Sequence, residues 1–554
     1  MTAYASVTAQ RLREYWPVLA AVVLGLLLPC SSYDFWLPDE PRVAHTAYEM
    51  GRSSSYLLPE VNETPFLQVP PLHYWLLSGW FRLFGASDAS ARYLSVTASL
   101  GTVLCLMWLA WRYGGLHLAL VSGAVLASTA QFWDVGHRVV VETSLTCFLT
   151  ITFACLAVVF VERRRSLVWS SLAGLGLGGA FLVKGIPGPV YVATVCGAVF
   201  CLRRERPARQ ELVGLLSLVV TAVVVALPWA VAFHHSYPAE FRELTVDHVL
   251  RRVFDGGVKN PSTFEFFHRS LGNLLPWAIV IPVVLVAHGR CAWGKRRGER
   301  FAPRSGCAAR WSGFLLLWAL MPLILLTFSR SKRQLYLLPV FPPFALLTGI
   351  WLEDTFHRLS PWRARILLWG VFVTSAAGAV VAVERGVSAG LSPSWVLYLI
   401  VSLLVFIAFR WLPRRFWLGG AVGTERLAAL VVLTVATWGT VYHIARTPEK
   451  AVASFCQELE RQESAGFTIV GYQLSEREIG AVAWYLKHPI PLYEGALDGL
   501  LARHGKSLVV GDAKDLEAWV GRALERHEVL VEKKQRRRTL WVARPDGLRS
   551  QTEN

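Results

Sequence analysis

Long apolar runs separated by short basic segments recur over the first four-fifths of the chain, and they constrain its fold more than any other feature. The first run, from Trp16 to Leu37, follows Arg11 and Arg13. It is too long for the apolar part of a cleaved signal, so it predicts an uncleaved first membrane span. With 54% hydrophobic residues and a mean hydropathy of +0.40, the sequence predicts a polytopic α-helical membrane protein.

In a membrane protein, the positions of the basic residues indicate which loops lie on the cytoplasmic side. A formal net charge of +17 would suggest nucleic-acid binding in a soluble protein. Here the basic residues gather between apolar runs, where they orient the chain in a membrane, and we expect no nucleic-acid partner. The nine cysteines contain no CxxC pair, so we expect neither a disulfide framework nor a zinc site built on them.

The aromatic segment Pro70–Phe84 decides the sidedness of everything after it. It is short and carries His73 and Arg82, which favours a helix that lies in the membrane interface over one that crosses. The strongly basic loops then fall on the cytoplasmic side, as the positive-inside rule requires: 162–165, 203–206, 295–297, 358–365 and 410–415. This interpretation predicts about 13 spans, a cytoplasmic N-terminus and an external C-terminus. It also predicts a long external loop from the end of the first span to about Val69, a short turn at 184–187, and external segments at 133–143, 234–271, 329–335 and near 384–385.

Paired carboxylates follow the first predicted span directly. Asp39 and Glu40 precede Arg42 by three and two residues. Charge at a lipid boundary is costly unless it has a partner or a task, so these three residues are candidates for a functional site. The alternative is that the two acids only end the helix and face water.

Three cations in the predicted external loop 329–335 break the charge rule that the other basic loops obey. Arg330, Lys332 and Arg333 are suited to hold an anion such as phosphate at the external interface. Snorkelling of long side chains toward lipid headgroups is the alternative. The segment 234–271 is long and contains Gly256-Gly257, which fits a mobile lid or a disordered linker.

The last hundred residues differ in composition from the rest. Residues 447–554 are polar, and they contain two strand-like stretches, two helical patterns and a hairpin pattern: 467–472, 507–511, 475–487, 512–524 and 529–543. This length is sufficient for one small α/β domain. We therefore predict a membrane domain at 1–446 and a small external α/β domain at 447–554.

Four motifs together carry a family resemblance. They are the acid pair after the first span, Pro70-Pro71-Leu72-x-Tyr74-Trp75, Glu142-Thr143-Ser144-Leu145, and Ser331-Lys332-x-x-x-Tyr336-x-Leu338-Pro339-x-x-Pro342. In this order they resemble the lipid A aminoarabinose transferases, which are membrane glycosyltransferases of the GT-C fold related to protein O-mannosyltransferases. The resemblance covers the whole membrane part and the tail. It implies a multi-pass protein of the bacterial inner membrane, with a periplasmic active site and a periplasmic C-terminus.

The resemblance also implies a reaction and its partners. A sugar would move from a polyprenyl (undecaprenyl) phosphate donor to lipid A, another envelope glycolipid or polysaccharide, or a protein. A lipid-linked sugar transporter or flippase without transfer chemistry is the alternative, and a non-catalytic scaffold is a third. We find no internal repeat, and the acids collect at one interface, whereas a transporter would be expected to place ionisable residues near the bilayer midplane.

Roles carry over by position. Asp39 corresponds to the family's catalytic carboxylate, with Glu40 as the second candidate base, and Glu142 would orient substrate or balance the charge of Arg42. The expected contacts of the donor are Lys332, Tyr336, the neighbouring Arg330 and Arg333, and His268 as a lid histidine.

One departure from the family stands before the paired prolines. Gln68-Val69 replaces the family's usual Glu-Lys, a pair associated with a metal site and with phosphate binding. A divalent metal ion therefore stays open as a cofactor, with His268 as a candidate ligand. Arg330 or Arg333 could replace the missing cation.

Overall fold

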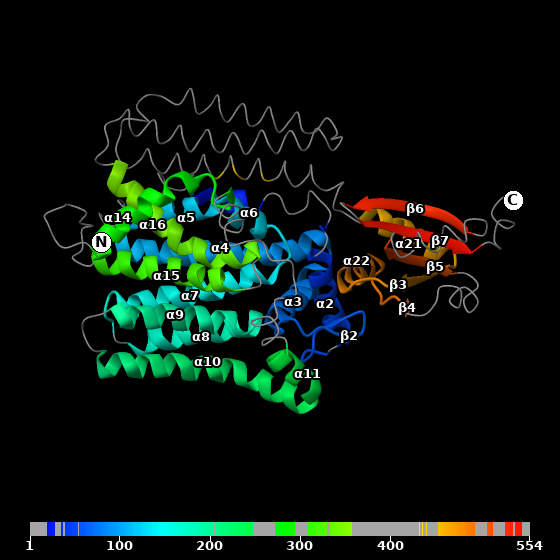
Figure 1. Ribbon diagram of the computed structural model, residues 1–554, viewed down its shortest axis with the longest axis horizontal. Helices are drawn as coiled ribbons and strands as arrows, with labels where there is room; N and C mark the ends of the chain where they lie inside the picture. The colour runs from blue at the N-terminus through cyan, green and yellow to red at the C-terminus, as the bar shows by residue number, and fades with distance from the viewer. Residues whose placement is uncertain are drawn as a thin grey trace, which may run out of the picture. The chain divides into compact units, whose positions relative to one another are not determined.

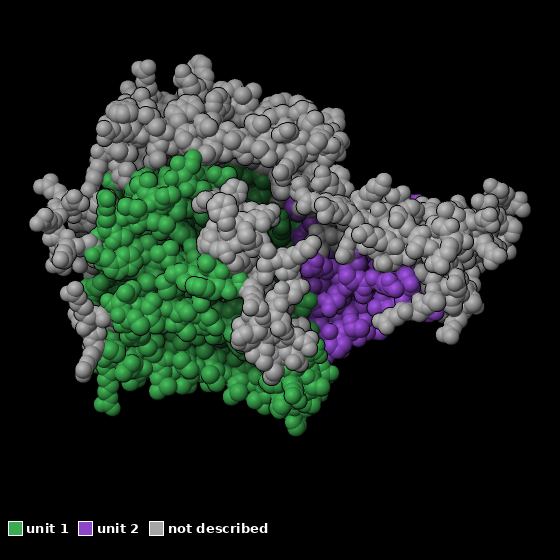
Figure 2. All heavy atoms as spheres, viewed as in Figure 1, with its two compact units in different colours: residues 1–31, 67–73, 92–442 green, residues 32–66, 74–91, 443–554 purple. Residues whose placement is uncertain are grey.

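The computed structural model describes most of the chain up to residue 356 and part of the tail. The described residues are 19–20, 22–27, 35–36, 39–53, 55–164, 166–202, 207–247, 272–293, 308–329, 333–356, 432, 435, 439, 453–493, 507–512, 527–535 and 538–545. The chain divides into two compact units (Figure 2). The first unit contains residues 1–31, 67–73 and 92–442, and the second contains 32–66, 74–91 and 443–554.

The first unit is a bundle of long apolar helices (Figure 1). Its helices are α4 (Asp88–Gly114), α5 (Leu116–Ala127), α6 (Ala130–Gly136), α7 (Val141–Phe160), α8 (Leu167–Lys184), α9 (Pro187–Leu202), α10 (Arg209–Ser236), α11 (Pro238–Arg242), α14 (Ile281–Trp293), α15 (Ala308–Phe328) and α16 (Phe341–Phe356). Short helical turns lie at Glu243–Asp247 (η1), Trp277–Ile279 (η2) and Gln334–Val340 (η3).

Six helices in the described part of the chain are long and apolar enough to cross a membrane. A seventh is counted if α5 and α6, which meet at a bend of 71°, form one broken span. The prediction of a polytopic α-helical membrane protein is therefore confirmed. Of the first predicted span only residues 19–20, 22–27 and 35–36 are described, and of the spans expected after Phe356 only residues 432, 435 and 439, so the number 13 stays a prediction.

Glycines on two faces of α8 let it pack closely between α7 and α10. A Cβ atom at Gly174 would lie 2.5 Å from the carbonyl oxygen of Leu218 in α10, and one at Gly176 would lie 2.9 Å from the carbonyl oxygen of Phe148 in α7. Small residues of this kind allow helix backbones to approach each other in a membrane. Because α7 and α8 are antiparallel neighbours, the first residues of α7 lie beside the last residues of α8.

The second unit combines the polar stretch after the first predicted span with the tail. It holds α2 (Glu40–Ser53), the hairpin strands β1 (Glu60–Val61) and β2 (Thr64–Pro65), and most of α3 (Leu72–Phe84). From the tail it holds α21 (Ala453–Ser464), β3 (Thr468–Tyr472), α22 (Glu476–Leu486), β4 (Leu492–Tyr493), β5 (Ser507–Asp512), β6 (His527–Gln535) and β7 (Arg538–Pro545). The sheet order is β4-β3-β5-β7-β6, with β3 parallel to β4 and β5 and with β7 antiparallel to β5 and β6.

The core of this unit lies between the sheet and its helices. Its buried side chains are Phe455, Cys456, Leu459, Phe467, Ile469, Ala481, Val482, Leu486, Ile490, Leu508 and Val510. The strands and the helix predicted at 467–472, 507–511 and 475–487 are present as β3, β5 and α22. The predicted hairpin is β6 and β7, and the helix predicted at 512–524 lies outside the described residues.

Two expectations about the segment after the first span have different outcomes. Residues 40–53 were expected within the long external loop without a helix of their own, and they form α2 instead. Val43, Ala44, Ala47 and Met50 are buried, and their spacing of three to four residues places them on one face of a helix. The aromatic segment forms α3, a helix of 13 residues, which is too short to cross a bilayer, as predicted.

Candidate functional site

A buried ion pair joins the start of α7 to the end of α8. The Lys184 ammonium lies 2.5 Å from Oε1 of Glu142, and the two side chains are 9% and 7% exposed. The same ammonium lies 4.2 Å from the ring centre of Tyr336 in η3. A cation over an aromatic face is attracted by the ring electrons, and more strongly where water is excluded. We call Glu142, Lys184 and Tyr336 the lysine cluster.

The position of Lys184 follows from the local sequence. Gly185 adopts a positive φ of 75°, a conformation that glycine takes with little cost, and it ends α8 directly after the lysine. Pro187 then begins α9, where its fixed φ suits the first turn of a helix. The turn predicted at 184–187 is therefore confirmed, and it holds a cation at the end of an apolar helix.

Tyr336 is held by polar contacts of the residues before it. Gln131 of α6 donates a hydrogen bond of 2.8 Å to the backbone oxygen of Gln334. Asn273 donates one of 2.6 Å to the side-chain oxygen of Gln334. These contacts fix the start of η3 and so the ring that faces Lys184. Arg333 precedes η3 and is exposed.

A neutral histidine lies close to this cluster. His73 is fully buried, and its Nδ1 lies 3.0 Å from the hydroxyl of Ser144, two residues after Glu142. Burial lowers the pKa of His73 to about 4, although the charge of Glu142 opposes the shift. At neutral pH this imidazole therefore carries no charge, and its ring takes part in hydrogen bonds as the neutral form.

The acids after the first predicted span form a second group of contacts, within the second unit. Arg42 lies 3.1 Å from Oδ1 of Asp39 and 3.8 Å from Oε2 of Glu476, and its guanidinium lies 5.0 Å from the centre of the Phe66 ring. The Arg42 side chain is 8% exposed, and that of Asp39 is 19% exposed. This arrangement pairs the Asp39 carboxylate with the Arg42 guanidinium and leaves it reachable from solvent.

Glu40 has a different environment from its neighbour. It is 2% exposed, and its carboxylate accepts a hydrogen bond of 2.8 Å from the backbone N–H of Trp36. A buried carboxylate used in this way fixes the start of α2. Of the two candidate bases, Asp39 is therefore the more accessible.

The packing of α22 on α2 sets the place of Arg42. A Cβ atom at Gly480 would lie 2.9 Å from the Cα atom of Arg42, so only glycine fits there without a shift. Nearby, Asn62 donates a hydrogen bond of 2.9 Å to the backbone oxygen of Ile490 and accepts one of 2.6 Å from its N–H. The polar stretch and the tail are thus tied together around Asp39.

The sequence-predicted residues divide into three sets. The structure joins Glu142 to Tyr336 through Lys184, and it joins Asp39 to Arg42. Within the first unit Glu142 pairs with Lys184, and its expected roles toward the substrate or toward Arg42 stay predictions. His268, Arg330 and Lys332 lie outside the described residues. Lys184 was not singled out from the sequence, although a lysine at the predicted external end of an apolar run breaks the positive-inside rule.

No metal site forms among the residues that the structure describes. Their His, Cys, Asp and Glu side chains include no group of three that could hold a metal ion, and Gln68 is a poor metal ligand at the position of the family's acid.

Comparisons with known proteins agree with these features. The family model of dolichyl-phosphate-mannose-protein mannosyltransferases matches residues 68–231. Among curated proteins, an undecaprenyl phosphate-alpha-4-amino-4-deoxy-L-arabinose arabinosyl transferase of Pectobacterium carotovorum is 27% identical over 66% of this chain and 63% of that protein. The corresponding transferase 1 of Pseudomonas fluorescens is 26% identical over 93% of this chain and 91% of that protein. The match thus spans less than two thirds of the first relative and nearly all of the other.

Solved structures give the same result for the fold. The crystal structure of ArnT from Cupriavidus metallidurans bound to undecaprenyl phosphate superimposes with a TM-score of 0.78 and 20% sequence identity, over 95% of this chain and 97% of that one. Its apo state gives 0.76. The chain therefore shares the GT-C fold of these ArnT structures, and its sequence is similar to the curated arabinosyl transferases.

Proposed function

We propose that the chain is an inner-membrane glycosyltransferase that moves a sugar from a polyprenyl phosphate donor to a lipid A-type acceptor. The observation that carries this proposal is the buried lysine cluster, in which Glu142 and the ring of Tyr336 hold the Lys184 ammonium at one end of the helix bundle. The names of the relatives specify undecaprenyl phosphate and 4-amino-4-deoxy-L-arabinose. The departure at Gln68-Val69 leaves the sugar of this chain open.

The reaction requires a cation of this kind. Attack on the anomeric carbon passes through an oxocarbenium-like state, by analogy with glycoside chemistry. Negative charge builds on the departing phosphate, and a fixed cation stabilises it most where water is excluded. An ammonium has three N–H donors, so Lys184 can keep its contact with Glu142 while it donates to a phosphate oxygen. We assign this role to Lys184, with Arg330, Lys332 and Arg333 as further donor contacts and His268 as a lid residue.

Asp39 is assigned to the acceptor. A carboxylate near an acceptor hydroxyl takes up its proton as the new bond forms, which typically contributes about 10² to 10⁴-fold. A phosphate acceptor is already ionised and needs only to be positioned. The exposure of Asp39 and its fixed contact with Arg42 suit either task, and Glu40 is the second candidate.

The finer architecture belongs to the same proposal. We infer about 13 spans, a cytoplasmic N-terminus, a periplasmic C-terminus and a small periplasmic α/β domain at 447–554. The basic loops support this orientation through the positive-inside rule. Both Asp39 and the lysine cluster then face the periplasm.

Mass spectrometry of envelope glycolipids tests the proposal. Cells that lack the gene are complemented with the parent, with Lys184→Met or with Arg164→Gln, whose side chain is 63% exposed and lies outside the cluster. We expect a sugar-bearing glycolipid with the parent and the Arg164 variant, and its loss with the Lys184 variant. Identical glycolipid profiles in all four strains would contradict a transferase function.

A further inference from the structure

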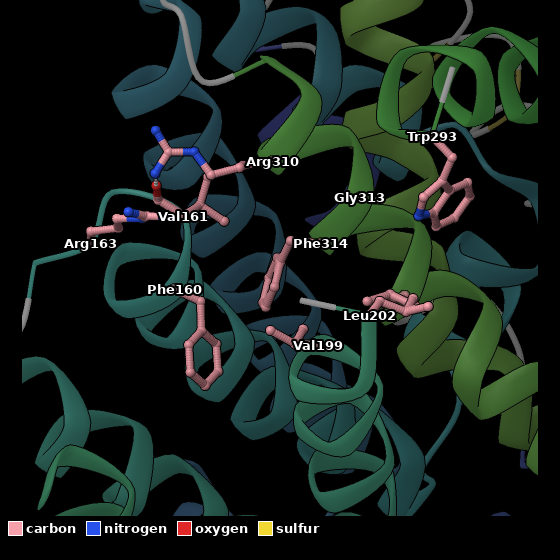
Figure 3. A pocket seen from close by; sticks show the side chains of 10 residues that line it. Phe160, Val161, Arg163, Val199, Leu202, Trp293, Arg310, Gly313 and Phe314 are labelled. Atoms are coloured by element: carbon pink, nitrogen blue, oxygen red, sulfur yellow. Dashed lines mark hydrogen bonds between the residues drawn. The ribbon is translucent and has the colours of Figure 1, made fainter. Parts of the chain in front are cut away.

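A pocket lies between four helices of the first unit (Figure 3). Its volume is about 260 Å³. The lining residues come from α7 and the turn after it, α9, α14 and α15: Phe160, Val161, Arg163, Val199, Leu202, Trp293, Arg310, Gly313, Phe314 and Leu317. Pockets for whole small molecules span about 300 to 1,000 Å³, so this one suits part of a larger amphipathic molecule.

The pocket lies at the end of α7 that is remote from the lysine cluster. Glu142 is the second residue of α7 and Phe160 is the last. A helix of 20 residues is about 30 Å long at 1.5 Å per residue, which equals the thickness of the hydrocarbon core. The pocket and the lysine cluster therefore belong to opposite faces of the membrane. The basic runs at 162–165, 203–206 and 295–297 identify the face of the pocket as the predicted cytoplasmic one.

Charged and apolar side chains line different sides of the pocket. Arg163 and Arg310 lie together on one side, and Leu202 and Trp293 lie across from them (Figure 3). Both arginines are exposed, and Arg310 donates a hydrogen bond of 3.3 Å to the backbone oxygen of Val161. Between the two sides the lining is apolar, with Phe160 and Phe314.

The backbone conformation at Arg163 positions this side chain beside the pocket. Its φ is 56°, a left-handed conformation that is uncommon for residues other than glycine. A left-handed residue commonly ends a helix, and here it turns the chain after α7 and leaves Arg163 among the residues that line the pocket. The adjacent acid, Glu162, accepts a hydrogen bond of 3.0 Å from Arg112 of α4, which directs its charge away from the pocket.

We propose that this pocket binds an anionic glycerophospholipid of the cytoplasmic leaflet. The lipid phosphate lies against the guanidiniums of Arg163 and Arg310, whose forked donors match phosphate oxygens. The upper part of an acyl chain lies on Phe160, Phe314 and Leu202, and Trp293 borders the glycerol region, where amphipathic rings are favoured. Basic pockets between helices on the cytoplasmic side are suited to lipid headgroups of this charge.

This site goes beyond the proposed transfer reaction and is independent of it. The donor phosphate is assigned to the lysine cluster at the other end of α7, so a phosphate in the pocket belongs to another molecule. A lipid held here would join α7, α9, α14 and α15 at their cytoplasmic ends.

Native mass spectrometry of the purified full-length protein tests the proposal. The protein is taken from nanodiscs of phosphatidylcholine with one fifth phosphatidylglycerol, and retained lipids are counted. We expect phosphatidylglycerol to be retained in preference to phosphatidylcholine. Each cation near the surface contributes roughly fivefold to binding, so Arg163→Gln with Arg310→Gln should reduce retention by about 25-fold. Lysine at both positions should largely preserve it.

Each kind of test variant has a matched control, one for the loss of charge and one for the added leucine side chain. Arg164→Gln is the control for charge, because Arg164 contacts Glu162 at 3.5 Å and does not line the pocket. Gly313→Leu fills the pocket, since a Cβ atom there meets only Ala292 at 3.9 Å. Gly197→Leu adds the same side chain on α9, where a Cβ atom meets nothing within 4 Å. We expect Gly313→Leu to release the lipid and both controls to keep it.

Several results would overturn the proposal. Equal retention of the neutral and the anionic lipid would remove the role of the arginines. Retention unchanged in Gly313→Leu would place the lipid elsewhere, even if the arginine variants failed to fold. Displacement of phosphatidylglycerol by polyprenyl phosphate at equal concentration would assign the pocket to the donor. Because binding is measured without turnover, a failed transfer reaction leaves the result unaffected.

Discussion

Removing the charge of Lys184 separates stability from catalysis at the lysine cluster. Both partners of the ion pair are less than 10% exposed and lie 2.5 Å apart. Lys184→Met keeps most of the length of the side chain but leaves the Glu142 carboxylate buried without its counter-charge, which costs about 3 to 5 kcal/mol. Glu142→Gln together with Lys184→Met removes both charges, and replacing a buried ion pair by uncharged groups is often nearly neutral for stability.

Activity should respond differently from stability. If Lys184 stabilises the departing phosphate, the single and the double variant should both lose about 10² to 10³-fold in turnover, the scale of one fixed electrostatic contact in a transition state. Thermal unfolding of the purified protein and turnover with a polyprenyl phosphate sugar are measured in parallel. The expected pattern is a double variant that is as stable as the parent and yet inactive.

A control lies at the other end of the same helix. Arg112 hydrogen-bonds to Glu162 where α4 and α7 end, and these side chains are 20% and 19% exposed. Arg112→Gln should lower the unfolding temperature and leave turnover within a few-fold of the parent. Recovery of turnover by the double variant at the cluster would refute the reasoning, because Lys184 would then be only a structural partner of Glu142.

Three further predictions concern the second unit and the topology. Asp39→Asn removes charge and basicity but keeps shape, so turnover should fall by roughly a hundredfold with donor binding intact; turnover within a few-fold of the parent would exclude Asp39. Burial, and then the charge of Lys487, lower the pKa of His45 to about 3. Below about pH 6.5 the unfolded chain takes up a proton at His45 and the folded chain does not. The free energy of unfolding therefore falls by about 1.4 kcal/mol for each pH unit below that value. Between pH 7 and 5 the parent should therefore lose about 2 kcal/mol more stability than His45→Gln, as measured by hydrogen exchange in α2, and equal losses would count against the shift. Reporters fused after Arg165 or Arg297 should be cytoplasmic and one after Arg446 periplasmic, and a cytoplasmic tail would reverse the topology.

Local patterns predicted much of the secondary structure. The helix at 475–487 begins where Ser475 and Glu478 form a capping box, with a hydrogen bond of 2.9 Å from the Ser475 N–H to the Glu478 carboxylate. It ends at Lys487, which has a positive φ of 63°. The spacing of Ser475 and Glu478 is a start signal that is visible in a sequence, whereas a lysine at the helix end is not a stop signal of that kind. The apolar runs likewise predicted the long helices, because a span needs about 20 such residues.

Contacts between distant residues were beyond the sequence. Glu142 and Lys184 are 42 positions apart, and charge rules locate each near an interface without pairing them. Asn62 and Ile490 are 428 positions apart, so a boundary drawn by composition does not show that the second unit includes residues 32–66. Helix α2 was missed because its mean composition is polar, while its buried face consists largely of small residues such as Ala44 and Ala47.

Sugar transfer by the purified full-length protein is the most direct test of the central claim. The protein is reconstituted in liposomes with a polyprenyl phosphate aminosugar and lipid A, and both lipids are followed by mass spectrometry over time. We expect one molecule of free polyprenyl phosphate for each sugar that lipid A gains, and neither product with Lys184→Met. Movement of the intact donor across the bilayer, with lipid A unchanged in mass, would contradict it and identify a flippase.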